Sequence, residues 1–141
     1  MINVILFLFL VTMPVQHSPA VNEHVKMEIS IQTNVSAKTS VAVSFHLTPS
    51  EGIHINTSPA IEFVLAKDSP YELSGKPQYK KSKKDYLDHT MPVTITLNAK
   101  KNSIAGKTLI KGKLNYFYCS DTEGWCSRFS QPVEITVEIK R

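Results

Sequence analysis

Large apolar and polar residues alternate with a period of two along most of the chain, the pattern of strands that bury one face. Within residues 41–48, for example, a large apolar side chain occupies every second position from Val41 to Leu47. The same alternation predicts strands over residues 27–31, 41–48, 61–65, 93–97, 110–118 and 133–139. No window shows a sustained helical period, so the chain is predicted to be all-β.

Short segments rich in Gly, Pro, Ser and Asp separate the predicted strands, as expected for turns. They cover residues 48–52, 68–70, 74–77, 98–106 and 120–124. Six to eight short strands at this spacing favour an immunoglobulin-like antiparallel β-sandwich, with a small barrel as the alternative. Repeats and low-complexity tracts are absent from the sequence, so we expect residues 21–141 to form a single domain.

The amino-terminal segment carries an apolar run from Val4 to Val11. This run is far shorter than the roughly 20 apolar residues that a transmembrane helix needs. Small residues follow it at Ser18 and Ala20, which is typical of a secretory signal peptide cut after Ala20. We therefore expect residues 1–20 to be a signal peptide, the mature domain to be periplasmic or secreted, and the protein to have no membrane span.

Composition is that of an ordinary globular protein, with 42% hydrophobic and 20% charged residues in a chain of 141. It excludes a disordered or collagen-like chain. Lys plus Arg number 16 against 12 Asp plus Glu, and much of the excess lies at Lys80, Lys81, Lys83 and Lys84. Because no helical or aromatic pattern accompanies this run, it indicates a solvated loop, and we expect no nucleic-acid partner.

Candidate chemistry is confined to the segment from Tyr116 to Cys126. The sequence has no phosphate-binding loop, zinc-protease motif or serine-hydrolase motif. Cys119 and Cys126 are separated by six residues that include a glycine, so they can pair if the chain turns back on itself.

Three interpretations of the two cysteines remain open. A structural disulfide is natural in an exported protein. A redox-active disulfide is favoured by the placement of the pair at an exposed loop beside Tyr118 and Trp125, because exposed and tightly looped disulfides tend to be labile. A metal site would need further ligands, such as His54 or His89. Of these, the metal site has the weakest support, and we expect neither a metal nor another cofactor.

Three segments carry a likeness to a known family: Gly52–Asn56, Tyr86–Val93 and Cys119–Cys126. In them the chain resembles the amino-terminal periplasmic domain of the DsbD family, the thiol:disulfide interchange proteins or protein-disulfide reductases. The likeness covers essentially the whole predicted mature chain, and the cysteine hairpin is its most specific part. It departs from the best-known pattern because the cysteines stand one residue further apart.

The resemblance implies an immunoglobulin-like domain that carries electrons as a dithiol/disulfide pair. Cys126 would be the attacking thiol and Cys119 the resolving one. A cap loop would shield the sulfurs with the ring of Tyr79, while His54 and Asn56 would lie beside them. The implied partners are a thioredoxin-like electron donor and oxidised extracytoplasmic thiol proteins, and we expect a monomer.

Charges near the cysteines temper their expected reactivity. A thiolate is stabilised by nearby positive charge, whereas Asp121 and Glu123 lie between the two cysteines and would oppose it. Arg128 or the lysine run could offset them, so we expect no strongly acidic thiol. The alternative function, from another class, is an extracytoplasmic immunoglobulin-like binding module whose disulfide is purely structural.

Overall fold

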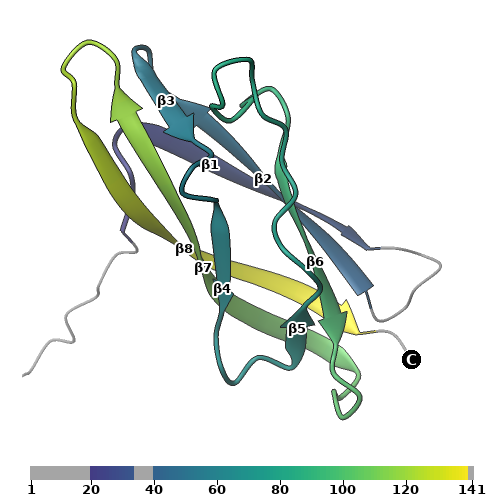
Figure 1. Ribbon diagram of the computed structural model, residues 1–141. Helices are drawn as coiled ribbons and strands as arrows, with labels where there is room; N and C mark the ends of the chain where they lie inside the picture. The colour runs from purple at the N-terminus through teal and green to yellow at the C-terminus, as the bar shows by residue number, and fades with distance from the viewer. Residues whose placement is uncertain (1–19, 34–39, 140–141) are drawn as a thin grey trace, which may run out of the picture.

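The computed structural model describes residues 20–33 and 40–139. Within these residues the secondary structure is eight strands and no helix, and every strand pairing is antiparallel. The all-β prediction is therefore confirmed (Figure 1). The strands are β1 (Val25–Thr33), β2 (Ser40–Pro49), β3 (Ile53–Asn56), β4 (Glu62–Leu65), β5 (Tyr71–Leu73), β6 (Val93–Ala99), β7 (Gly106–Ser120) and β8 (Cys126–Ile139).

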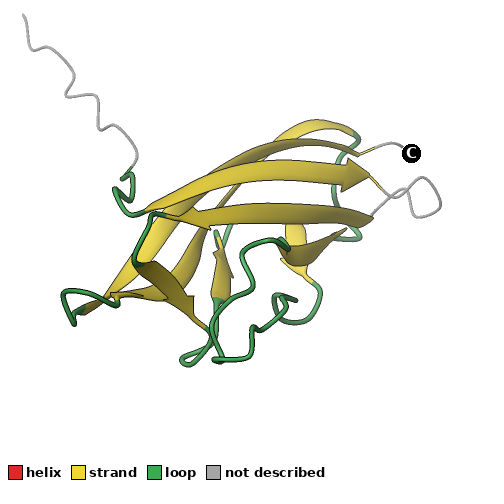
Figure 2. Cartoon of the chain, turned by 90° about the horizontal axis from the view of Figure 1, so that it is seen from above, coloured by secondary structure: helices red, strands yellow, loops and turns green. Residues whose placement is uncertain are grey.

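Two sheets make up the fold. The first has the order β1-β2-β6-β5. In the second, the long strand β7 pairs with β8 along one edge and with β3 and then β4 along the other edge. The sheets form two layers, as the view from above shows (Figure 2). This arrangement fits the predicted sandwich rather than the alternative of a closed barrel.

Apolar side chains from alternate positions fill the space between the sheets. In β2, Val41, Val43, Phe45 and Leu47 are all buried, as the alternation predicted. The ring of Phe45 from the first sheet stacks on Phe63 of β4 in the second sheet, with centroids 5.7 Å apart. Contacts of this kind join the layers through dispersion and the hydrophobic effect, independently of the cysteines.

The β7–β8 hairpin determines which way the cysteines face. Its register runs from Gly106 opposite Ile139 to Cys119 opposite Cys126. Leu114, Tyr116 and Tyr118 of β7 are buried on the core side. Because successive side chains of a strand point to opposite faces, Cys119 and its partner lie on the outer face of the second sheet, the face turned away from the first sheet.

Two strands escaped prediction because each offers only two alternating apolar positions, fewer than the three in residues 61–65. They are β3, with four residues, and β5, with three. The alternation was also imperfect at the end of the edge strand β1, where Ile31, expected to face inward, is 39% exposed.

The predicted signal peptide lies almost entirely outside the described residues, which begin at residue 20. Within the described part of the chain, no helix is long and apolar enough to cross a bilayer.

Candidate functional site

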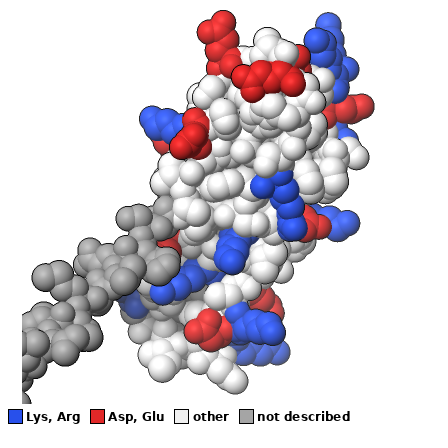
Figure 3. Space-filling model, turned by 90° about the vertical axis from the view of Figure 1, so that its left-hand side faces the viewer, with Lys and Arg blue, Asp and Glu red and all other residues white. Residues whose placement is uncertain are grey.

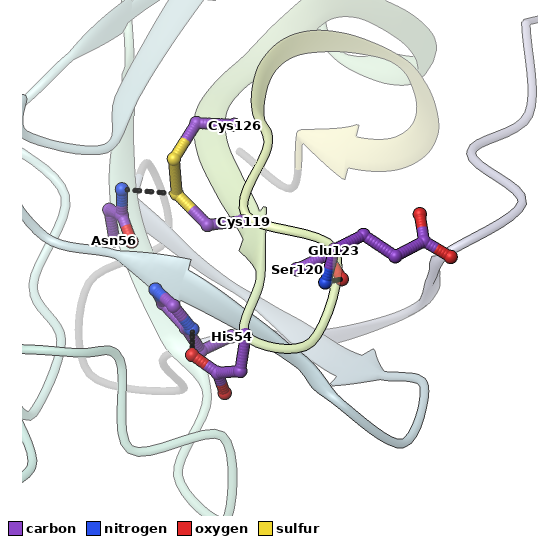
Figure 4. Close-up of a disulfide and its surroundings, with 7 residues drawn as sticks. His54, Asn56, Cys119, Ser120, Glu123 and Cys126 are labelled. Atoms are coloured by element: carbon purple, nitrogen blue, oxygen red, sulfur yellow. Dashed lines mark hydrogen bonds and ion pairs between the residues drawn. A yellow bond between two sulfur atoms is a disulfide. The ribbon is translucent and has the colours of Figure 1, made fainter.

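A disulfide joins Cys119 at the end of β7 to Cys126 at the start of β8. The two residues lie directly opposite each other in the ladder, and their Cα atoms are 4.0 Å apart. The bond therefore connects neighbouring strands of one sheet, on its outer face, and does not join the two sheets through the core (Figure 4). The sequence correctly predicted that this pair meets.

The two sulfurs belong to residues of very different exposure. Cys119 is only 6% exposed, whereas Cys126 is an exposed residue. An approaching thiol therefore reaches Cys126 more easily than Cys119. The roles of attacking and resolving thiol stay predictions.

Asn56, at the end of β3, contacts the covered sulfur directly. Its side-chain Nδ2 donates a hydrogen bond to Cys119 Sγ at 3.1 Å. The register explains the contact, because Asn56 lies opposite Phe117 and is therefore the diagonal neighbour of Cys119. The carbonyl Oδ1 of the same amide is buried and has no hydrogen-bond partner among the described residues.

His54, two residues earlier in β3, lies directly opposite Cys119 in the ladder. Its side chain is 16% exposed, and its Nδ1 lies 2.8 Å from Asp121 Oδ1. The two atoms are close but not aligned as a regular hydrogen bond, so the contact is electrostatic and becomes an ion pair when the imidazole is protonated. On its face, the imidazole stacks on Tyr86 with centroids 3.7 Å apart.

The turn between the cysteines is held by its own hydrogen bonds. The N–H of Gly124 donates to the carbonyl of Ser120, and the N–H of Ser120 donates to the carbonyl of Trp125. Gly124 has a φ of 71°, in the left-handed region that favours glycine. The turn is also bonded to a neighbouring segment: the N–H of Asp121 donates to the carbonyl of Gly52 at 2.9 Å, which fixes the tip against the residues before β3.

Trp125 and Tyr118 lie on the other side of the hairpin from the sulfurs. Tyr118 is buried on the core face of β7, and Trp125 packs against it edge to face at 5.7 Å. The indole Nε1 donates to Glu123 Oε2 at 2.5 Å. These two residues therefore pack under the turn on the face opposite the disulfide and do not surround it.

Tyr79 is half-buried and packs against the core beside Ile61, Phe63 and Leu73. The aromatic ring that lies next to His54 is instead that of Tyr86. The cap role of Tyr79 stays a prediction. The structure thus brings His54 and Asn56 together with the cysteines, as expected, and adds Asp121 and Tyr86, whose contacts the sequence did not reveal.

Surface charge near the disulfide is mixed in sign. Asp121 and Glu123 of the turn are exposed, and so are all four lysines of the run between residues 80 and 84. Figure 3 shows acidic and basic side chains close together at the upper end of the molecule, where the hairpin tip lies in Figure 1. Within the described residues, no group of three His, Cys, Asp or Glu side chains is arranged to hold a metal ion.

Comparisons with protein-family models, with curated proteins and with solved structures found no match to this chain.

Proposed function

We propose that the protein is a dithiol/disulfide carrier that exchanges electrons with thioredoxin-fold proteins through Cys119 and Cys126. The observation that carries this proposal is the placement of the disulfide on the outer face of one hairpin, with one exposed and one covered cysteine. A bridge that serves stability alone gains most when it closes a long loop, whereas this one closes a short turn that its own hydrogen bonds already hold.

Independence of the core from the disulfide supports the same conclusion. A carrier must stay folded in both its oxidised and its reduced form. The core between the sheets consists of about twenty buried apolar residues that contact one another across the two layers. Because neither cysteine belongs to the cluster of buried side chains between the sheets, reduction removes no part of this core.

The exchange begins with attack on the exposed cysteine. A thiolate of the partner attacks Cys126 Sγ, a new disulfide forms between the partner and Cys126, and the Cys119–Cys126 bond breaks. Its electron pair stays on Cys119 Sγ as a thiolate, which then takes a proton from water. A second thiol of the partner attacks the partner's own sulfur in the mixed disulfide and releases Cys126 as a thiolate. The carrier leaves with two thiols and the partner with a disulfide.

The resemblance to the DsbD family supports the choice of partner. It suggests a thioredoxin-like donor, oxidised extracytoplasmic thiol proteins as acceptors, and a periplasmic or secreted location. The low exposure of Cys119 favours a second candidate, an immunoglobulin-like binding module with a purely structural disulfide. The two candidates differ in whether a thioredoxin-fold protein forms a mixed disulfide with the chain.

Single-cysteine variants test this proposal. Cys119→Ser leaves Cys126 free, and Cys126→Ser leaves Cys119 free. Each reduced variant is mixed with a thioredoxin-fold protein whose attacking cysteine is activated by a coloured thiol leaving group. We expect Cys119→Ser to accumulate the mixed disulfide on non-reducing gels and Cys126→Ser to form little or none. If neither variant forms it, the carrier function is wrong, and if only Cys126→Ser does, the two cysteine roles are reversed.

A further inference from the structure

The hydrogen bond between Asn56 and Cys119 stabilises the oxidised and the reduced protein to different degrees. We propose that the Asn56 amide is a catalytic group that stabilises Cys119 as the leaving sulfur and shifts the disulfide towards its reduced form. This inference rests on the proposed function only in assuming that the bond is exchanged. It concerns which sulfur leaves and how easily the bond is reduced.

In the oxidised protein only one end of the Asn56 amide has a hydrogen-bond partner among the described residues. A disulfide sulfur carries no proton, so only the N–H end of the amide can bond to it, and it accepts weakly. Nδ2 makes this bond to Cys119 Sγ at 3.1 Å. Oδ1 is buried without a partner among the described residues, and an unpaired buried carbonyl is unfavourable.

Reduction provides the hydrogen-bond donor that Oδ1 of Asn56 lacks in the oxidised protein. Adding two electrons and two protons converts the disulfide to two thiols, so an S–H donor appears beside Asn56 for the first time. The amide can then present Oδ1 to the thiol, or keep its N–H on the sulfur while that sulfur is a thiolate. Bonds to a charged acceptor are stronger than bonds to a neutral one. Asn56 therefore stabilises both reduced forms of Cys119 more than it stabilises the disulfide.

The same contact directs the exchange. When a thiolate attacks Cys126, the breaking bond delivers its electron pair to Cys119 Sγ, the atom that already accepts the N–H of Asn56. Attack on Cys119 would instead place the developing charge on Cys126, to which Asn56 donates no hydrogen bond. Exposure and hydrogen bonding thus favour the same direction of attack.

Asn115 provides a matched control within the same strand. It is buried on the outer face of β7, whereas Asn56 is half-buried, and as in Asn56 its Oδ1 has no hydrogen-bond partner within the described part of the chain. It stands four residues before Cys119, which is roughly 13 Å along a strand. Replacing Asn115 by leucine therefore makes the same chemical change without touching either sulfur.

The test compares Asn56→Leu, Asn115→Leu and the unaltered chain, each equilibrated with glutathione redox buffers and scored for free thiols. We expect Asn56→Leu to shift the equilibrium about tenfold towards the disulfide, which is about 30 mV for a two-electron couple. Asn115→Leu should leave it unchanged. A shift of less than twofold in Asn56→Leu, or an equal shift in both variants, would overturn the proposal.

A second variant tests the proposal if Asn56→Leu does not fold. Asn56→Asp retains the shape and the acceptor but loses the donor and adds a charge that opposes the thiolate. We expect dithiothreitol to reduce this variant at least tenfold more slowly than the unaltered protein, and an unchanged rate would contradict the role of the N–H group. Because both readouts use small thiols, they stay interpretable even if no thioredoxin-fold protein exchanges with the chain.

Discussion

The two ends of the β7–β8 hairpin have the same backbone pairing but opposite surroundings. At the end that begins with Gly106, the outer face carries exposed charges, and Lys111 lies 3.8 Å from Glu134 with both side chains more than 60% exposed. At the other end, the outer-face residue Cys119 is covered and contacts Asn56. We call these the open end and the covered end.

The difference arises because β3 flanks the covered end and does not reach the open end. Beside the covered end, β3 pairs with β7 on one edge and on the other receives a backbone hydrogen bond from Leu87 to the carbonyl of Ile55. Polar groups there are partly removed from water, which makes each contact stronger and each unpaired atom more unfavourable. At the open end, water screens the charges, so their pairing contributes little.

Removing the disulfide is the largest change that this comparison predicts. Replacing both cysteines by serine should lower the free energy of unfolding by about 2 to 3 kcal/mol, the chain-entropy value for so short a loop. The core is untouched, so we expect the variant to remain folded with its β-sheet circular dichroism intact. Urea denaturation measures the difference. A double variant that is unfolded in buffer would show that the fold depends on the disulfide and would contradict a carrier role.

Alkaline pH probes the core under the covered end. Burial raises the pKa of Tyr116 to about 12, although Asn22 donates a hydrogen bond to its hydroxyl. An unfolded tyrosine titrates near pH 10, so above that pH the unfolded chain loses the proton more readily than the folded one. Stability is therefore unaffected below about pH 10 and falls between about pH 10 and 12, by about 1 kcal/mol at pH 11.

The matching measurement is the urea midpoint at pH 9 and pH 11. Tyr116→Phe should lose less stability over this interval than the unaltered chain does, because the titrating group is gone. Equal losses in both proteins would mean that other groups cause the alkaline effect.

The smallest predicted effect compares one acid at each end. Asp121→Asn removes the carboxylate that lies 2.8 Å from His54 Nδ1; because Asp121 is 57% exposed and the pair is ionic only with a protonated imidazole, the change should destabilise the fold by at most about 1 kcal/mol. Glu134→Gln, at the exposed pair with Lys111, should change stability by less than about 0.3 kcal/mol. Thermal or urea unfolding of both variants under one condition provides the comparison. Equal effects would show that the covered end strengthens no electrostatic contact.

Much of the fold was predictable because alternation records burial on one face. The strands around Phe45, Ile95 and Ile135 each have enough residues to display the period, and all three side chains are buried. The short strands β3 and β5 offer only two alternating apolar positions each, and their pairing depends on neighbours distant in sequence. The sequence therefore predicted the strands with three or more alternating apolar residues better than it predicted the shortest ones.

The site was predictable in part for a different reason. Cys119 and Cys126 are brought together by a local turn, which spacing alone can suggest. The positions of His54 and Asn56 beside them came from the resemblance; in the structure His54 lies opposite Cys119 in the ladder and Asn56 contacts its sulfur. The stacking of Tyr86 on His54 joins residues 32 positions apart, and Tyr86 lies in the segment between β5 and β6, which forms no regular strand. No periodic signal in the sequence could reveal it.

The reduction potential of the unaltered protein is the most direct test of the central claim that this disulfide is exchanged. It is measured by equilibrating the protein with glutathione buffers of graded composition and counting free thiols by mass spectrometry after alkylation. An exchange-active pair is predicted to lie between about −270 and −180 mV, the range from thioredoxin to protein disulfide isomerase. A value below about −300 mV would identify an inert structural bridge and contradict the account.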